Sequence, residues 1–171
     1  MDSRFAVFFL IMGGLDTYLN DCPTDCTRQT EAPAQVTLQY GDTYFQEKVI
    51  GSEVYGIYDF PMRYGAFQPT MGASLTSDND FWVGAGGKWT TDRSTGSPIF
   101  IELSLMPGIY LQGDGPDIGF PLQFRGALGA GVHLGDKASV SVVFDHRSNA
   151  NITSLNPGIE TLTLRFSMKL D

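Results

Sequence analysis

The most constraining feature of the sequence is a two-residue alternation that runs through residues 120–134. Every second side chain is apolar or small, and the side chains between them are polar or small. Successive side chains of a β-strand point to opposite faces, so this pattern predicts a strand with one apolar face. The apolar face comprises Phe120, Leu122, Phe124, Gly126, Leu128, Ala130, Val132 and Leu134.

The same alternation recurs elsewhere, interrupted by clusters of Gly, Asp, Asn, Ser and Pro that favour turns. The clear segments are residues 79–89, 97–105, 137–146 and 158–170, and the weaker ones are residues 34–40, 44–50, 54–60 and 64–75. After residue 30 the sequence shows no convincing amphipathic helix. The chain is therefore predicted to be all-β, with eight or nine strands.

The polar face of these strands favours a barrel in a membrane. It carries Glu102, Arg125 and Arg165 among glycines and other small residues, which suits the narrow polar interior of an eight-stranded barrel whose apolar face meets lipid. Several segments reach the length of about 9–11 residues that crosses a bilayer, whereas strands of soluble sandwiches typically have about 5–6. We predict an eight-stranded antiparallel transmembrane β-barrel, with a soluble barrel as the alternative.

Composition agrees with this fold and excludes some functions. The 11 Lys and Arg residues are outnumbered by 19 Asp and Glu, so the net charge of −8 argues against a nucleic-acid-binding protein, which needs clustered basic charge. The mean hydropathy of −0.07 resembles that of a soluble domain. In an alternating barrel, however, this value is the average of one lipid-facing and one lumenal set of side chains.

Residues 1–30 form an N-terminal segment, and residues 31–171 are assigned to the barrel. The apolar run of residues 5–12 is typical of a weak or trimmed secretory signal, with a periplasmic lead-in or a buried first element as alternatives. Cys22 and Cys26 are the only cysteines, too few for a zinc site; they are either a local disulfide or free thiols.

An even number of strands predicts that both ends of the barrel chain lie on the periplasmic side. The tight turn at residues 135–137 is then a periplasmic hairpin. The longer connections at residues 110–119 and 147–157 are then external loops, the usual asymmetry of outer-membrane barrels.

Three polar residues share the apolar, outward parity of the last two strands. His146 and Ser148 continue the outward set of residues 137–146, and Glu160 continues that of residues 158–170. The two strands are consecutive and antiparallel, so their outward residues become cross-strand neighbours. An imidazole and a carboxylate facing lipid are costly unless they are paired or functional. The alternative is a chance grouping in which His146 is an interfacial residue at a strand end.

These side chains suit ester hydrolysis by a serine nucleophile. Ser148 would attack the ester carbonyl, His146 would accept its proton, and Glu160 would orient and stabilise the imidazole. Backbone N–H groups after Ser148, or the amides of Asn149 and Asn156, would stabilise the oxyanion. His133, which has inward parity, is assigned to a polar network in the lumen.

The stretch from His146 to Glu160 resembles the signature of the lipid A 3-O-deacylase (PagL) family. The matching residues are His146, Ser148, Asn149, Ala150, Asn156, Pro157, Gly158, Ile159 and Glu160. The resemblance implies an eight-stranded barrel of the bacterial outer membrane that removes an ester-linked hydroxyacyl chain from lipid A. It assigns His146 as the base, Ser148 as the nucleophile and Glu160 as the acid, with Asn149 and Asn156 as oxyanion or supporting residues.

The chain departs from this signature at Arg147, where an aromatic residue is expected. Its charge suggests contact with a lipid A phosphate. The expected partners are lipid A or lipopolysaccharide and the membrane, with no metal or cofactor; the sequence leaves a homodimer open. Alternative functions are an outer-membrane phospholipase and a structural or adhesion barrel without catalysis.

Overall fold

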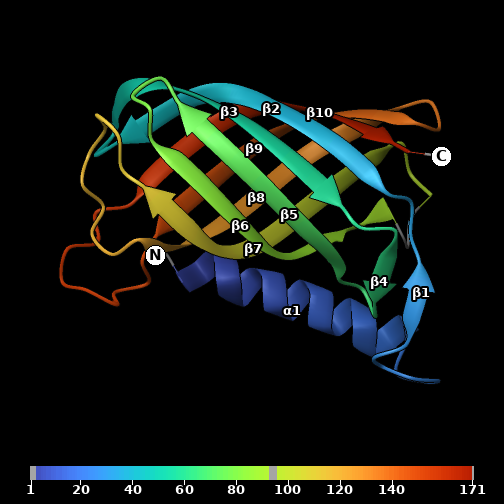
Figure 1. Cartoon of the computed structure of the whole chain (residues 1–171). Helices are drawn as coiled ribbons and strands as arrows, with labels where there is room; N and C mark the ends of the chain where they lie inside the picture. Colours follow the sequence, from blue (N-terminus) through green and yellow to red (C-terminus); the bar gives the residue numbers. More distant parts are fainter. Residues whose placement is uncertain (1–2, 93–95, 171) are drawn as a thin grey trace.

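The computed structural model describes residues 3–92 and 96–170, and most of this chain is antiparallel β-sheet (Figure 1). One helix, α1 (Ser3–Asn20), precedes the sheet. The long strands are β2 (Gln35–Phe45), β3 (Lys48–Asp59), β5 (Gln68–Thr76), β6 (Phe81–Thr90), β7 (Ile99–Leu111), β8 (Leu122–Leu134), β9 (Ala138–Ser148) and β10 (Ile159–Lys169). Two short strands, β1 (Gln29–Glu31) and β4 (Met62–Tyr64), form a separate small sheet.

The long strands close into a single barrel. Each pairs with its neighbours in the chain, and β10 pairs with β2 from Lys169 opposite Gln35 to Glu160 opposite Tyr44. Closure leaves no exposed sheet edge. The strands range from 9 residues in β5 to 13 in β7 and β8, long enough to cross a bilayer. The predicted eight-stranded antiparallel barrel is confirmed.

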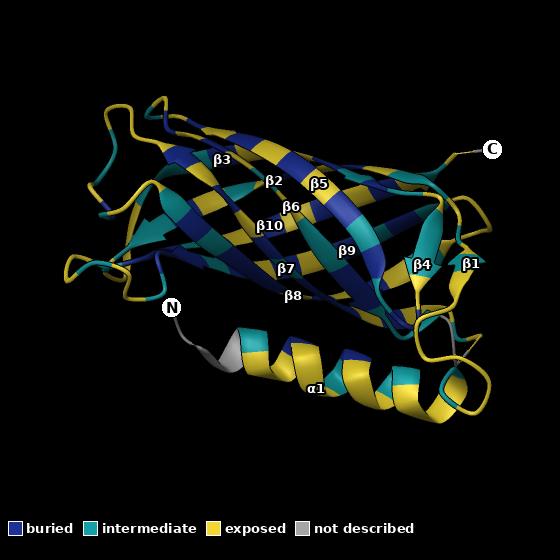
Figure 2. Cartoon of the chain, turned by 60° about the horizontal axis from the view of Figure 1, so that its bottom comes forward, coloured by how far each residue is buried: buried dark blue, intermediate teal, exposed yellow. Residues whose placement is uncertain are grey.

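Burial alternates along the strands in the predicted sense, with apolar side chains outside (Figure 2). In β10, Leu164 is 61% exposed whereas the adjacent Arg165 is 4% exposed. In β8, Arg125 is buried in the lumen and Leu128 faces outward. A soluble barrel would show the reverse arrangement, so this burial pattern is that of a barrel surrounded by lipid.

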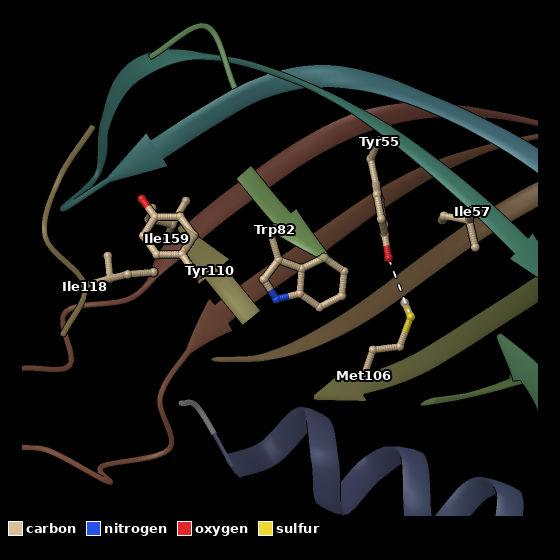
Figure 3. Close-up of a cluster of buried hydrophobic side chains, with 7 residues drawn as sticks. All are labelled: Tyr55, Ile57, Trp82, Met106, Tyr110, Ile118 and Ile159. Carbon is tan, nitrogen blue, oxygen red and sulfur yellow. Dashed lines mark hydrogen bonds between the residues drawn. The ribbon is translucent and has the colours of Figure 1, made fainter. Parts of the chain in front are cut away.

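The lumen also contains aromatic and aliphatic side chains, not only charged and small ones. They form a cluster of Tyr55, Ile57, Trp82, Met106, Tyr110, Ile118 and Ile159 (Figure 3). The guanidinium of Arg125 lies 3.8 Å from the centre of the Tyr55 ring. Aromatic faces attract cations, so these rings help to hold buried charge inside the barrel.

Helix α1 lies along the outside of the barrel, against β6, β7 and β8 (Figures 1 and 2). The indole Nε1 of Trp89 donates a hydrogen bond to Asp16 at 2.7 Å, and the rings of Phe9 and Phe67 lie 5.0 Å apart. The helix extends well beyond the apolar run of residues 5–12. In the described part of the chain, no helix has the length and apolar character needed to cross a membrane.

After α1, Cys22 and Cys26 are joined in a disulfide, one of the two predicted alternatives.

The two ends of the barrel differ in their connections. One end, called here the site end, carries the β7–β8 connection (residues 112–121) and the β9–β10 connection (residues 149–158). The opposite end carries the tight turn at residues 135–137. The first and last barrel strands also begin and end there, because Gln35 is opposite Lys169 and the Lys169 N–H donates to the carbonyl of Lys137 at 2.8 Å.

Candidate active site

The outward faces of β9 and β10 bring an imidazole and a carboxylate into contact at the site end. Glu160 is the direct cross-strand partner of His146. Nδ1 of His146 lies 2.8 Å from Oε1 of Glu160. The side chains are 12% and 30% exposed, so the pair is sheltered but reachable from the outer surface. The predicted pairing of these residues on the lipid-facing side is therefore present.

Ser148 is the last residue of β9 and has the same parity as His146, but its side chain is 0% exposed. The two residues are two positions apart, about 6.6 Å along a strand. Oγ of Ser148 and Nε2 of His146 are both buried, and neither has a hydrogen-bond partner among the described residues. Other buried atoms, such as Nε1 of Trp82 and Oγ1 of Thr161, also lack a partner among the described residues, so this feature is compatible with a catalytic role for Ser148 and His146 but does not single them out.

Gly158 makes room for the imidazole. Its φ is +74°, and a Cβ on this residue would lie 2.6 Å from Cε1 and 3.2 Å from Nε2 of His146. Glycine is therefore required here both for the left-handed backbone and for the space that the ring occupies. In the sequence, Gly158 is one of the residues that match the family signature, but nothing there indicates this contact.

Asn149 and Asn156 hold the chain that follows Ser148. The main-chain N–H of Asn149 donates to Oδ1 of Asn156 at 2.8 Å. The Asn149 side chain is buried, and its Nδ2 lies 2.7 Å from the carbonyl of Leu155 and 3.3 Å from that of Ile118 in the β7–β8 connection. These contacts join the two long connections of the site end and use the amide donors of Asn149.

A groove of about 380 Å³ on the outer surface includes Glu160 in its lining. It is formed by the last two strands, by β2 and by the connections beside them. Its lining residues are Tyr44, Gln46, Glu47, Phe144, Pro157, Glu160 and Leu162. Phe144 and Leu162 are cross-strand partners one outward position below the His146–Glu160 pair, so an apolar surface lies directly beside the polar site.

Comparison with known proteins shows the family to which the chain belongs. The sequence profile of the lipid A 3-O-deacylase (PagL) family matches residues 40–169. The chain belongs to this family. It is thus an outer-membrane β-barrel of the lipid A deacylase class of hydrolases. A search of curated proteins finds no match to the sequence.

Solved structures support the fold. The crystal structure of the outer-membrane enzyme PagL superposes with a TM-score of 0.62 at 20% identity, covering 80% of this chain and 99% of PagL. Neisserial surface protein A gives a TM-score of 0.56 at 10% identity, covering 84% of this chain and 99% of that protein. A de novo designed transmembrane β-barrel gives 0.54 at 11% identity, covering 82% and 100%.

This PagL-family chain carries a cluster of buried charges directly behind its site. The lumen ion-pair cluster consists of Glu53, Arg125, Asp145 and Arg147. Arg147 pairs with Glu53, and Arg125 pairs with both Glu53 and Asp145, the latter at 2.7 Å. All four side chains therefore lie in the lumen, with Asp145 held by Arg125.

The expectation that Arg147 contacts a lipid A phosphate is wrong. Arg147 is 0% exposed and points into the lumen, because its parity on β9 is opposite to that of His146 and Ser148. The cross-barrel partner Glu53 could not be identified from the sequence, since the register of the early strands was undetermined.

His133 lies at the other end of the PagL-family barrel, away from the site. Its Nε2 is 3.0 Å from Oδ1 of Asp92, and its ring packs on Phe100. These contacts match the structural role predicted for it.

Proposed function

We propose that this protein hydrolyses an ester-linked acyl or hydroxyacyl chain of lipid A, using Ser148, His146 and Glu160 on the lipid-facing side of the barrel. The observation that carries the proposal is the 2.8 Å contact between His146 and Glu160 on the outward face, beside Ser148. On a surface made to contact lipid, a paired imidazole and carboxylate with a nearby hydroxyl is the arrangement that a serine esterase requires.

The reaction follows from the direction of the contacts. Glu160 accepts a hydrogen bond from Nδ1–H of His146, which leaves Nε2 unprotonated and able to accept the proton of Ser148. The Oγ of Ser148 then attacks the ester carbonyl carbon. Collapse of the tetrahedral intermediate releases the sugar hydroxyl, which takes the proton from His146. Water hydrolyses the acyl-enzyme by the same route, and Glu160 stabilises the imidazolium each time it forms.

We assign Asn149 and Asn156 to a supporting role. The N–H that follows a nucleophile often contributes to an oxyanion hole. Here the N–H of Asn149 is donated to Asn156, and Nδ2 of Asn149 is used in the loops. In this arrangement the two asparagines stabilise the conformation of the β9–β10 connection, which begins directly after Ser148.

We assign the acyl chain to the groove. Phe144 and Leu162 continue the outward face below Glu160, so a chain lying against them has its tail toward the middle of the bilayer. The groove is lined by Glu160 but not by His146 or Ser148, so the ester would extend from the Glu160 end of the groove toward Ser148. We place the site end at the external leaflet, where lipopolysaccharide resides, because it carries the longer connections.

Mass spectrometry of lipid A from cells producing the protein tests the proposal. The wild type should release one acyl chain, and Ser148→Ala should release none while still assembling. Ser154→Ala is a matched control in the same connection, and it should keep full activity. Unchanged lipid A with the wild type would contradict deacylation and favour a structural barrel. Release of fatty acid from phospholipid, but not from lipid A, would instead favour a phospholipase.

A further inference from the structure

We infer that Arg147 is a positioning residue for the proposed triad. Anchored across the lumen, it fixes the end of β9 that carries His146 and Ser148. The inference rests on the proposed function, and it goes further because it assigns a catalytic purpose to a buried charge that touches no substrate.

The alternation of β9 places an anchor beside each proposed catalytic residue. His146 and Ser148 share the outward parity of β9, although Ser148 is itself 0% exposed, and the residues that flank them, Asp145, Arg147 and Asn149, are 1%, 0% and 0% exposed. Asp145 is bound to Arg125 inside the barrel, and Asn149 is bound within the connections. Arg147 is the anchor that lies between the base and the nucleophile.

Arg147 reaches across the barrel instead of bonding to a neighbouring strand. Its guanidinium donates to Glu53 of β3, the third strand from β9 in one direction. It also lies 5.9 Å from the ring centre of Trp82 in β6, the third strand in the other direction, and 5.8 Å from that of Tyr110. A buried ion pair contributes little net stability, but it favours one geometry strongly because either charge alone would be costly.

The end of β9 needs such an anchor because its pairing is one-sided. The last register pair between β9 and β10 is Arg147 with Ile159, so Ser148 pairs only with Phe124 of β8. The chain then turns away through Ala150, whose φ is +55°. The strand ladder therefore fixes His146 from both sides but Ser148 from only one. Misplacing a reacting group by 1 Å costs about 10²-fold in rate.

The test compares Arg147→Met with a matched buried arginine. Arg165 is also lumenal and paired, with Glu102 at 2.9 Å, and its neighbours Leu164 and Phe166 face lipid and have no proposed role in catalysis. Arg165 also donates to Gln39, which contacts Asp145, but its replacement leaves the Arg147–Glu53 and Arg125–Asp145 pairs in place. With a soluble 4-nitrophenyl ester and purified protein, Arg147→Met should lower kcat by about 10²-fold with KM nearly unchanged. Arg165→Met should leave both constants close to those of the wild type.

A double-mutant cycle separates positioning from general loss of structure. Glu53→Gln should also lower kcat, and the double variant Arg147→Met/Glu53→Gln should lose less than the product of the two single losses, since both changes break the Arg147–Glu53 pair and Glu53→Gln in addition weakens only the pair with Arg125. If Arg147→Met does not assemble, an assembled Glu53→Gln variant serves as the test. Wild-type kcat in the assembled Arg147→Met or Glu53→Gln variant would overturn the inference, as would an equal loss in Arg165→Met or multiplicative losses in the cycle.

The serine variant distinguishes the two levels of the argument. An active Ser148→Ala protein would refute the proposed triad, and the inference with it. An inactive Ser148→Ala protein together with a fully active Arg147→Met protein would refute the positioning role alone.

Discussion

Replacing Gly158 by alanine should inactivate the enzyme by displacing the imidazole of His146. The added Cβ would lie 2.6 Å from Cε1, whereas ordinary van der Waals contact begins near 3.4 Å. The contact atom belongs to a ring held by Glu160 at 2.8 Å, so it is not the free end of a flexible side chain. Either the ring or the β9–β10 connection has to move.

The size of the movement sets the expected loss. Restoring normal contact requires a shift of at least about 0.8 Å. Hydrogen bonds of this kind normally measure about 2.7–3.2 Å between heavy atoms, so such a shift is larger than the bond between His146 and Glu160 tolerates. We expect kcat to fall by about 10²-fold. An alanine in the left-handed backbone conformation should also lower the free energy of unfolding by about 1–2 kcal/mol.

Gly135 provides the control for this second effect. Its φ is +72°, nearly that of Gly158, but nothing lies within 4 Å of the position where its Cβ would be. Gly135→Ala should therefore share the backbone strain and keep its activity. Ester hydrolysis and thermal unfolding of both variants decide the matter. Wild-type kcat in Gly158→Ala would refute the claim that catalysis needs the His146 imidazole in its present position. An equal loss of kcat in Gly135→Ala would show that backbone strain, and not displacement of the imidazole, lowers the activity.

Three further predictions concern the site and its groove. Glu160→Gln should keep the contact with His146 but remove the charge that stabilises the imidazolium, so kcat should fall by up to about 10⁴-fold with little change in melting temperature. Leu162→Trp should narrow the groove and raise KM for long acyl chains more than for short ones, whereas Leu38→Trp elsewhere on the outer wall should not; equal KM values would exclude the groove as the acyl site. Asn149→Ala should lower the free energy of unfolding by about 1–3 kcal/mol and expose the site-end connections to proteases, and unchanged proteolysis would argue against its clamping role.

The sequence was sufficient where one rule, the two-residue period, decides the structure. The outward positions of His146 and Glu160, the lumenal position of Arg125 and the barrel itself all follow from parity and strand length. The same rule places Arg147 inside. The expected phosphate contact failed because it was drawn from the charge of the residue and not from its position.

Features that depend on loop geometry or on distant strands could not be predicted. The close approach of Gly158 to the imidazole depends on the conformation of the ten-residue connection at residues 149–158. Several backbone conformations are compatible with the sequence of such a connection. The pairing of Glu53 with Arg147 joins positions 94 residues apart and needs the register of three strands at once. Helix α1 extends beyond its apolar run because tertiary contacts, such as that of Asp16 with Trp89, add to local propensity.

The closing pair of β10 with β2 links enzyme activity to assembly. The proposed triad lies on the last two strands, but Tyr44, opposite Glu160 and part of the groove, belongs to the first barrel strand. Glu53, which holds Arg147, lies on the second. A chain whose first and last strands have not yet met thus lacks both the complete groove and the Glu53 contact of Arg147. On the proposed mechanism, ester hydrolysis therefore begins only after the barrel has closed.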